Sequence, residues 1–413
     1  MSSGARRHRR RLWAGALVVT CALGVAGPVS AQGRLRRPPD PQELQLPRRA
    51  PLTLTPSITV EEEYNDNVLL NNDERRWDFI TRFTPGIALE WESAVHRLAA
   101  AYSFSAELFA RHPERSHAFE RHDFFLDSLY RVNPQWTLTL SDTFTYDTDT
   151  NLIADEGIST GRDQAFGNIL AGSASWLVEP QTTLRAGASW AVQRFDREDL
   201  FDSDVYRADL TAEHAFSRRF TGSLGYEFGY FDIERQENTT THTPRLGVVY
   251  RFTETLTLRL SGGPTFEIAE GGPTHVVPAV SASLRQRAGW GTYGLDASQA
   301  VGIAGGLGGT TVNQAVGGFA QFTTLAKGLI VELVPRYSRV ESHDDRIDVG
   351  SFSLPLVATY RVTSWLALVA SYRFFHQRVD NTITSATGTP LASDVDQNRV
   401  AIGLQVGYPI RFE

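Results

Sequence analysis

The chain has 413 residues, a formal net charge of −7 and a single cysteine, Cys21. One cysteine excludes an intramolecular disulfide and a thiolate metal cluster. The negative charge makes the chain a poor candidate for nucleic-acid binding, so no nucleic-acid partner is expected.

The first 31 residues have the pattern of a secretory signal peptide. Five arginines between positions 6 and 11 precede the apolar run "LWAGALVVTCALGVAG", and "PVSA" at 28–31 offers small residues for cleavage. The apolar run is shorter than the ~20 residues that a membrane-spanning helix needs. A lipoprotein acylated at Cys21 is disfavoured because Thr20 stands where a smaller residue is usual. Cleavage would remove Cys21 and change the charge from −7 to −12, because five arginines leave.

Residues 32–52 are rich in proline and arginine, and this composition predicts an extended tail on the periplasmic side rather than a packed core. From residue 53 to residue 413, apolar residues alternate with small or polar ones, which predicts β-strands. In the last strand, apolar residues occupy alternate positions from Val400 to Phe412, while Arg399, Gly403 and Gln405 fall between them. Because side chains alternate along a strand, one face is apolar and the other is polar or small.

The alternating segments predict about 18 long strands, with a count of 16 also compatible. They cover 54–65, 78–92, 95–111, 118–133, 135–149, 164–178, 181–197, 203–217, 219–235, 239–252, 254–270, 275–288, 290–303, 312–325, 328–342, 348–362, 364–380 and 395–412. Strands of a soluble β-sandwich or propeller are shorter, with a usual length of ~5–6 residues. Tight breaks alternate with longer ones, so we predict an all-β, up-and-down antiparallel transmembrane barrel with short periplasmic turns and longer extracellular loops.

Three turns share one sequence pattern, namely "YRVNPQWTLTL" from Tyr130, "YRFTETLTLRL" from Tyr250 and "YRVTSWLALVASYRF" from Tyr360. The spacings are unequal, so the pattern does not define a repeating module. Aromatic rings are favourable at the level of lipid headgroups. We therefore predict an interfacial aromatic girdle that includes Tyr130, Trp136, Tyr250, Tyr360, Trp365, Tyr408 and Phe412.

Two stretches resemble a known family. They are "ITVEEEYNDNVLL" at 58–70 and "FITRFTPGIALEWESAVHRLAAAYSF" at 79–104, and the chain is similar in layout to the β-barrel porins of Gram-negative outer membranes, including those encoded near exopolysaccharide export genes. The resemblance implies an outer-membrane location and a role in passage or secretion. The final strand also resembles the assembly signal of such barrels, although Glu413 follows Phe412 where an aromatic usually ends the chain.

The sequence predicts no catalytic residue, no cofactor and no metal site. Neither His112, His117 and His122 nor the acidic stretch "EEEYNDN" at 61–67 has the spacing of a known metal site. No G-x-S-x-G motif occurs. Carboxylates near 142–149 would have to converge to act as a glycosidase pair. We therefore expect that the protein is not an enzyme.

Alternation assigns a set of charged side chains to the lumen. They are Arg82, Glu90, Arg97, Glu107, Asp127, Arg185, Glu227, Arg245, Arg259, Arg285, Glu332, Arg336, Arg373 and Arg399. Nine are arginines and five are acidic, which predicts an interior that tolerates anions or oligosaccharides. Alternatively, these side chains pair and merely fill the lumen.

These observations predict a passive, porin-like channel for saccharides or small solutes, with a link to exopolysaccharide export. A non-conducting structural or surface-interaction barrel is the alternative. The expected partners are outer-membrane lipid and lipopolysaccharide, the barrel-assembly machinery through the C-terminal strand, and a saccharide solute.

Overall fold

The computed structural model describes residues 52–153, 157–385, 388 and 390–412. The predicted signal peptide and the proline-rich tail up to residue 51 lie outside this range, and the first strand begins at Leu52. Among the described residues, no helix is long and apolar enough to cross a membrane.

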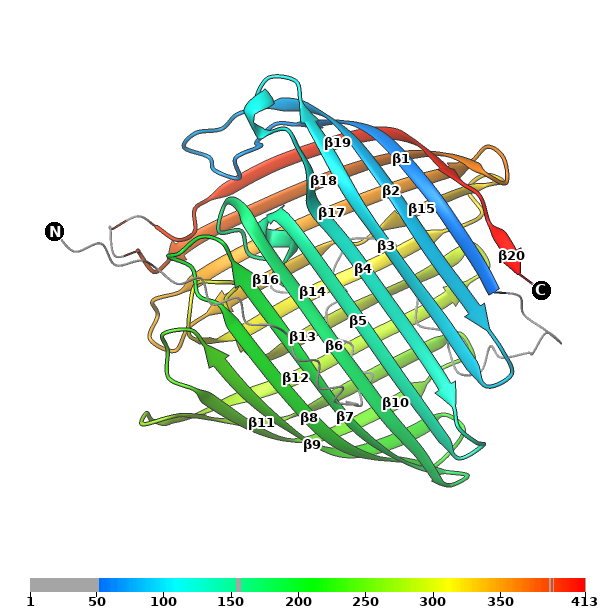
Figure 1. The fold of residues 1–413 in the computed structure, drawn as a ribbon. Helices are drawn as coiled ribbons and strands as arrows, with labels where there is room; N and C mark the ends of the chain where they lie inside the picture. Colours follow the sequence, from blue (N-terminus) through cyan, green and yellow to red (C-terminus); the bar gives the residue numbers. More distant parts are fainter. Residues whose placement is uncertain (1–51, 154–156, 386–387, 389, 413) are drawn as a thin grey trace, which may run out of the picture.

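The described chain is almost entirely antiparallel strand (Figure 1). The strands are β1 (Leu52–Asn65), β2 (Asp78–Glu92), β3 (His96–Phe109), β4 (His117–Arg131), β5 (Trp136–Asp149), β6 (Arg162–Glu179), β7 (Thr182–Phe195), β8 (Ser203–Ala215), β9 (Phe220–Ile233), β10 (Thr239–Arg251), β11 (Leu256–Ala269), β12 (Thr274–Ala288), β13 (Gly291–Ile303), β14 (Thr310–Phe322), β15 (Leu329–Leu333), β16 (Arg336–Glu341), β17 (Asp348–Arg361), β18 (Leu366–Asn381), β19 (Val395–Gly407) and β20 (Ile410–Phe412). Two single-turn 3₁₀ helices, η1 (Pro113–Arg115) and η2 (Thr150–Leu152), lie in the connections.

The sheet closes on itself. Successive strands from β1 to β14 and from β17 to β19 pair with each other, and β15 and β16 each lie between β14 and β17. β19 returns to β1 along a ladder that runs from Ser57 opposite Gly407 to Asn65 opposite Arg399. At two places a single passage of the chain along the wall, here called a crossing, is divided into two strands. A break before Pro335 separates β15 from β16, and β20 continues the line of β19 beside the start of β1. The 20 strands therefore form a closed barrel of 18 crossings, which confirms the predicted fold class and strand count.

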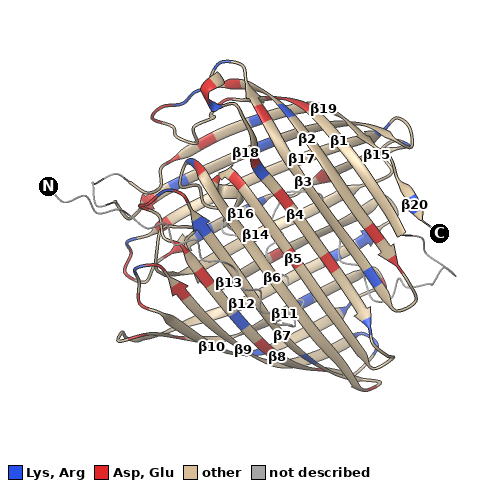
Figure 2. Cartoon of the chain, viewed as in Figure 1, with Lys and Arg blue, Asp and Glu red and all other residues tan. Residues whose placement is uncertain are grey.

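The two faces of the wall differ as alternation requires. On β19, Ile402 and Leu404 are 65% and 49% exposed on the outer face, whereas Arg399 and Ala401 are each 5% exposed on the inner face. Large apolar side chains are exposed in the same way on the outer face of nearly every strand. Figure 2 shows that charged residues are sparse along the strands and frequent in the loops at one end. The barrel thus has an apolar outer band.

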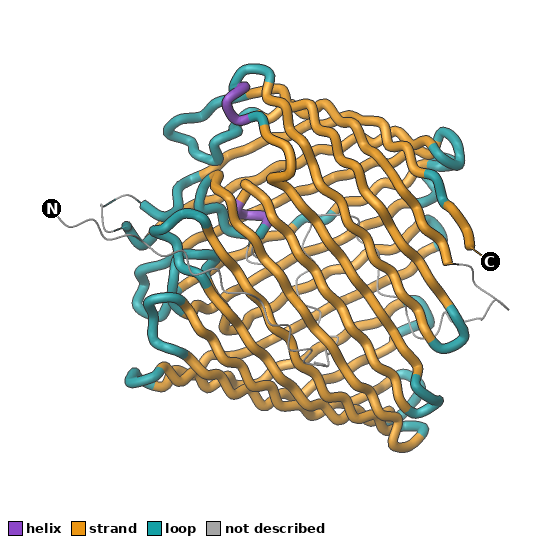
Figure 3. Tube along the Cα trace, in the orientation of Figure 1, coloured by secondary structure: helices purple, strands orange, loops and turns teal. Residues whose placement is uncertain are grey.

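The connections divide between the two ends of the barrel (Figure 3). At one end, which we call the turn side, eight short connections such as 180–181 and 289–290 join the strands. At the other end, the loop side, nine connections include the longer 66–77, 150–161 and 382–394. Both ends of the described chain lie at the turn side, because Leu52 of β1 pairs with Phe412 of β20.

The three similar turns share one hydrogen-bonding device. The side chain three residues after the tyrosine accepts a hydrogen bond from the first residue of the next strand: Asn133 from Trp136 (2.9 Å), Thr253 from Leu256 (3.0 Å) and Thr363 from Leu366 (3.0 Å). Asn and Thr commonly cap turns in this way. Turn chemistry, in addition to aromatic anchoring, accounts for the recurrence.

The predicted girdle residues lie near the turn-side end of their strands. Trp136 stacks on Trp176 with parallel rings 5.5 Å apart, and Trp365 is 48% exposed. Tyr130, Tyr360, Tyr408 and Phe412 are also exposed, and Tyr250 is half-buried. These positions agree with contact to an interface, which itself stays a prediction.

Candidate functional site

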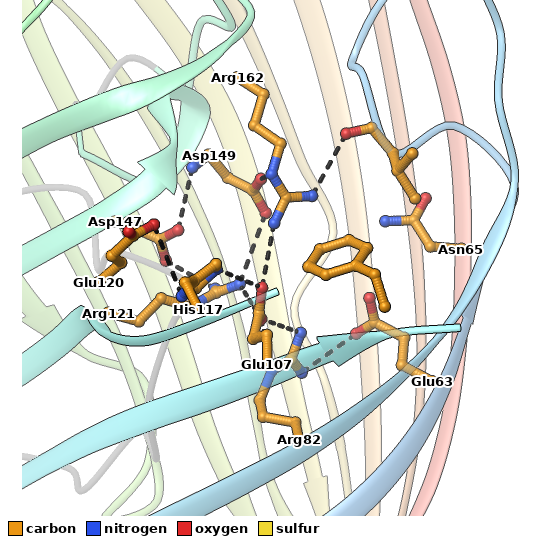
Figure 4. Close-up of polar contacts among 12 residues, drawn as sticks. Glu63, Asn65, Arg82, Glu107, His117, Glu120, Arg121, Asp147, Asp149 and Arg162 are labelled. Atoms are coloured by element: carbon orange, nitrogen blue, oxygen red, sulfur yellow. Dashed lines mark hydrogen bonds and ion pairs between the residues drawn. The ribbon is translucent and has the colours of Figure 1, made fainter. Parts of the chain in front are cut away.

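A cluster of buried charges lies inside the barrel toward the loop side (Figure 4). Adjacent strands supply its members, because each contributes one or two inward-facing positions near its loop-side end. We call the charge cluster the side chains of Glu63, Arg82, Glu107, Arg121, Asp147, Asp149, Arg162 and Arg399.

Glu107 on β3 is the centre of the charge cluster. Its carboxylate contacts the guanidinium groups of Arg82 at 2.8 Å, Arg121 at 2.7 Å and Arg162 at 3.0 Å, and its side chain has no exposed surface. A buried carboxylate is costly unless partners surround it. Three arginines from three different strands supply these partners and tie β2, β4 and β6 to β3.

Asp149 connects two distant parts of the wall. It ends β5 and pairs with the Arg399 guanidinium of β19, although β1 to β4 lie between these strands in the wall. Arg162 lies 3.7 Å from the same carboxylate. This ion pair therefore joins β5 to β19 across the loop-side end of the lumen.

The remaining contacts complete a balanced set. Arg121 contacts Asp147 at 2.6 Å, and Arg82 contacts Glu63 at 3.2 Å. Four arginines and four carboxylates make up the charge cluster, so the formal charge of these eight side chains is zero, and Glu61, which lies 3.4 Å from Arg82, adds one negative charge at the edge. A neutral set of fixed charges of both signs is suited to orienting a polar solute rather than to attracting ions of one sign.

Arg373 adds a cation beside this neutral set. It stands opposite Arg399 in the ladder between β18 and β19, on the same inward face. The side chain is half-buried and forms no hydrogen bond or ion pair with any other residue in the described part of the chain. Its guanidinium is thus available to an anionic or hydroxyl-bearing solute.

Apolar side chains from several loops meet above the charge cluster. We call the loop core the buried residues Ile158, Leu200, Ala304, Leu307, Val340, Ile347, Val349, Leu391 and Ala392. Most of them come from the β5–β6, β7–β8, β13–β14, β16–β17 and β18–β19 connections. Since their exposed fractions are between 0% and 4%, the described parts of these loops pack together and narrow the loop side.

Hydrogen bonds hold these loops in place. Gln377 of β18 donates to the Ser159 carbonyl at 2.8 Å, and Arg197 in the β7–β8 loop donates to the Thr160 carbonyl at 2.6 Å. Arg197 also donates to Asp199 at 2.6 Å, and this bond holds the pKa of the Asp199 carboxyl below its ordinary value. The β5–β6 and β7–β8 loops are thereby joined to each other and to the far wall.

All fourteen residues assigned to the lumen occupy positions on the inward side of their strands. Arg82, Glu107 and Arg399 join the charge cluster, and Arg373 lies beside it. The other ten lie between mid-barrel and the turn side: Glu90, Arg97, Asp127, Arg185, Glu227, Arg245, Arg259, Arg285, Glu332 and Arg336. Where they form ion pairs, these join neighbouring strands, as Arg185 with Glu213 (3.2 Å) and Arg245 with Glu227 (3.1 Å).

The set of side chains assigned to the lumen lacked five members of the charge cluster: Glu63, Arg121, Asp147, Asp149 and Arg162. Alternation with the outward Val60 and Tyr64 was sufficient to place Glu63 inward. Arg121 was harder, because the register shifts between Ser105 and Ala106 and breaks the alternation. Arg162 fell within a predicted loop.

The histidines and the acidic stretch that were considered as metal ligands make other contacts in the structure. His112 contacts Asp78 at 2.8 Å, His117 contacts Glu107 at 3.2 Å, and His122 turns outward to the Tyr102 hydroxyl at 2.8 Å. Glu61 and Glu63 face inward whereas Glu62 is exposed, so the acidic stretch does not converge. Within the ranges that the structure describes, no group of three or more histidine and carboxylate side chains is arranged to hold a metal ion.

No known family model matches the chain, and no curated protein is similar to it. Among solved structures, OccAB4 of Acinetobacter baumannii is 11% identical with a TM-score of 0.44, covering 88% of this chain and 99% of its own. The outer membrane protein opdK of Pseudomonas aeruginosa is 13% identical with a TM-score of 0.44, covering 86% and 99%. OccK2 (OpdF) of Pseudomonas aeruginosa, in complex with glucuronate, is 13% identical with a TM-score of 0.45, covering 88% and 98%. The fold assignment rests on the closed ladder itself.

Proposed function

We propose that this protein is an outer-membrane channel that passes small polar solutes through a constriction formed by the charge cluster. The membrane location rests on the outer face. Apart from the shorter β15, β16 and β20, the strands have 13 to 18 residues, which is longer than the ~9–11 residues that a tilted strand needs to cross a bilayer. Their apolar residues face outward, as lipid contact requires.

The observation that carries the channel proposal is the contrast between the two ends of the lumen. Toward the turn side, inward charges such as Glu90 and Arg259 are exposed, so the inner wall is open to water. Toward the loop side, the charge cluster and loop core narrow the passage. A wide vestibule that leads to a short charged constriction selects solutes by size and polarity.

Saccharides are the solute class that we favour. Neutral sugars present many hydroxyl groups, and a balanced set of guanidinium and carboxylate groups can donate to and accept from them. The unpaired Arg373 would also favour sugars that carry an acidic group. A role beside exopolysaccharide export belongs to this proposal, and secretion of the polymer by a strain lacking the protein would test it.

The proposed partners follow from the same placement. The outer band meets lipid, with lipopolysaccharide around the loop side, and the β19–β20 strand is the segment for the barrel-assembly machinery. A cleaved signal peptide over 1–31 would deliver the chain for export. We propose no enzymatic activity.

Swelling of liposomes that contain the folded protein tests the channel directly. We expect uptake of monosaccharides that falls steeply with solute size, because the constriction sets the limit. The second candidate is a non-conducting structural barrel, which the loop core favours. Liposomes that stay impermeable to every sugar would support that candidate and contradict the channel.

A further inference from the structure

The barrel wall separates between β12 and β13 near the loop side. These strands pair from Ala288 opposite Gly291 to Val280 opposite Gln299, and the ladder stops there. Within the described chain, residues 274–279 of β12 pair with β11 alone, and residues 300–303 of β13 pair with β14 alone. The end of the β13–β14 hairpin has therefore left the plane of the wall.

The hairpin tip lies inside the barrel instead. Residues 301–308 are all buried. Val301 and Ile303 pack in a cluster with Phe231 and Val277 on the inner wall, and Leu307 sits in the loop core with no exposed surface. The tip therefore blocks part of the lumen through which a solute would pass.

The backbone of the tip is fitted to this position. The Phe201 N–H donates to the Gly306 carbonyl at 2.9 Å. Gly306 and Gly308 have φ angles of +88° and +84°, which residues with a side chain rarely adopt. A Cβ atom at Gly306 would lie 2.9 Å from the Phe195 ring, so the tip packs closely against the β7–β8 segment.

A proline marks the point where the ladder stops. Pro278 of β12 stands opposite Pro264 of β11. Because proline has no N–H, two opposed prolines fit only at a pair of residues that do not hydrogen-bond to each other. At such a pair the backbone N and O atoms point to the opposite side of the strand, so those of Pro278 face β13. Pro278 cannot donate there. Its carbonyl accepts from the Gln299 side chain at 2.9 Å, and the Val301 carbonyl accepts from Arg207 across the lumen at 3.1 Å.

We propose that the β13–β14 hairpin tip, residues 300–311, is a gate that alternates between the docked position and the wall, where it pairs with β12. This inference rests on the proposed channel function. Continued register would place Val301 opposite Pro278 and Ile303 opposite Val276. If the tip returned to the wall, it would pair with the open edge of β12 and clear the lumen. One hydrogen bond would still be missing there, because Pro278 has no N–H to donate to Val301. The proline thereby favours the docked, closed position.

Cross-linking of two cysteines tests the movement. In the docked structure Val276 is 61% exposed on the outer face, whereas Ile303 is 7% exposed inside the lumen. The double variant Val276→Cys/Ile303→Cys can therefore be joined by a short bifunctional thiosulfonate, which forms a reducible disulfide with each thiol and releases sulfinate, only when the tip returns to the wall. Val280→Cys/Gln299→Cys is the matched control, because this pair is already opposed on the same two strands. The mature chain offers no competing thiol.

We expect both variants to cross-link, the control faster, and cross-linked Val276→Cys/Ile303→Cys to conduct at least about twice as well as its reduced form. Adding Pro278→Val restores one hydrogen bond in the wall and should speed that cross-linking about fivefold to tenfold. Failure of Val276→Cys/Ile303→Cys to cross-link, while the control does and the wild type conducts, overturns the gate alone. Cross-linking without a change in conductance also overturns it. Absence of conductance from every form removes the channel function itself.

Discussion

Gln377 on β18 and Ser159 in the β5–β6 loop exchange two hydrogen bonds across the mouth of the barrel. The Ser159 N–H donates to the glutamine oxygen at 2.7 Å, and the glutamine nitrogen donates to the Ser159 carbonyl at 2.8 Å. The same nitrogen donates to the Ser393 carbonyl at 2.9 Å. One fully buried side chain therefore holds two loops that belong to distant strands.

Replacing Gln377→Leu should release the β5–β6 loop without unfolding the barrel. The change leaves buried backbone groups without partners, which costs about 1–3 kcal/mol. We expect the Ser159 amide to exchange its hydrogen about tenfold faster or more, while amides in the wall keep their protection. Gln405→Leu, at an inward glutamine toward the turn side, is the control and should leave Ser159 unchanged. Equal exchange in both variants would show that Gln377 does not hold the loop.

Replacing Glu107→Gln should destabilise the barrel strongly. The change removes the negative charge that three buried arginines share, and breaking such a network costs about 3–5 kcal/mol. Urea titration of reversible folding in detergent measures the loss. Glu213→Gln, which removes a more exposed ion pair with Arg185, should cost about 1 kcal/mol or less. A similar small loss at both positions would argue against a tightly coupled charge cluster.

The strands could be predicted from the sequence because alternation is local. The expected ranges for β2 and for β5 agree with the structure within one residue, and the tight and long breaks fall where they were expected. The break before Pro335 was missed, because the inward and outward positions continue unchanged across it. The charge cluster depends on which distant strands face each other near the rim. No local pattern encodes the approach of Asp149 to Arg399, so the sequence could place inward charges but not assemble them.

A charge on the outer face should oppose membrane insertion in a way that an inward charge does not. Leu368 is 42% exposed on the outside of β18, and Val369, the next residue, faces the lumen opposite Gly403 and Thr359. Leu368 lies three residues from Trp365 at the turn-side end of β18. We expect Leu368→Arg to destabilise the folded barrel in bilayers by about 1–2 kcal/mol, between the costs at the interface and at the midplane. Val369→Arg should destabilise it much less. Indistinguishable effects of the two arginines would contradict the assigned faces.

Arg373 should set part of the ion preference. Removing its charge with Arg373→Gln should lower the anion-to-cation permeability ratio about twofold, the combined effect on anion and cation of one unit charge about 8 Å away in water at about 0.1 M salt. The reversal potential in a salt gradient measures this ratio. Arg378→Gln is the control on the same strand, because that side chain is 72% exposed on the outer face and pairs with Asp380. A shift that is as large for the control as for Arg373→Gln would place the selective charge elsewhere.

Single-channel recording in planar bilayers tests the channel most directly. The protein should first be shown to be folded by its heat-dependent mobility on a gel, so that silence cannot be attributed to misfolding. The constricted lumen leads us to expect small, discrete conductance steps with a preference for anions that weakens in Arg373→Gln. Correctly folded protein that produces no steps at any voltage, with or without the hairpin tip locked in the wall, would contradict the account.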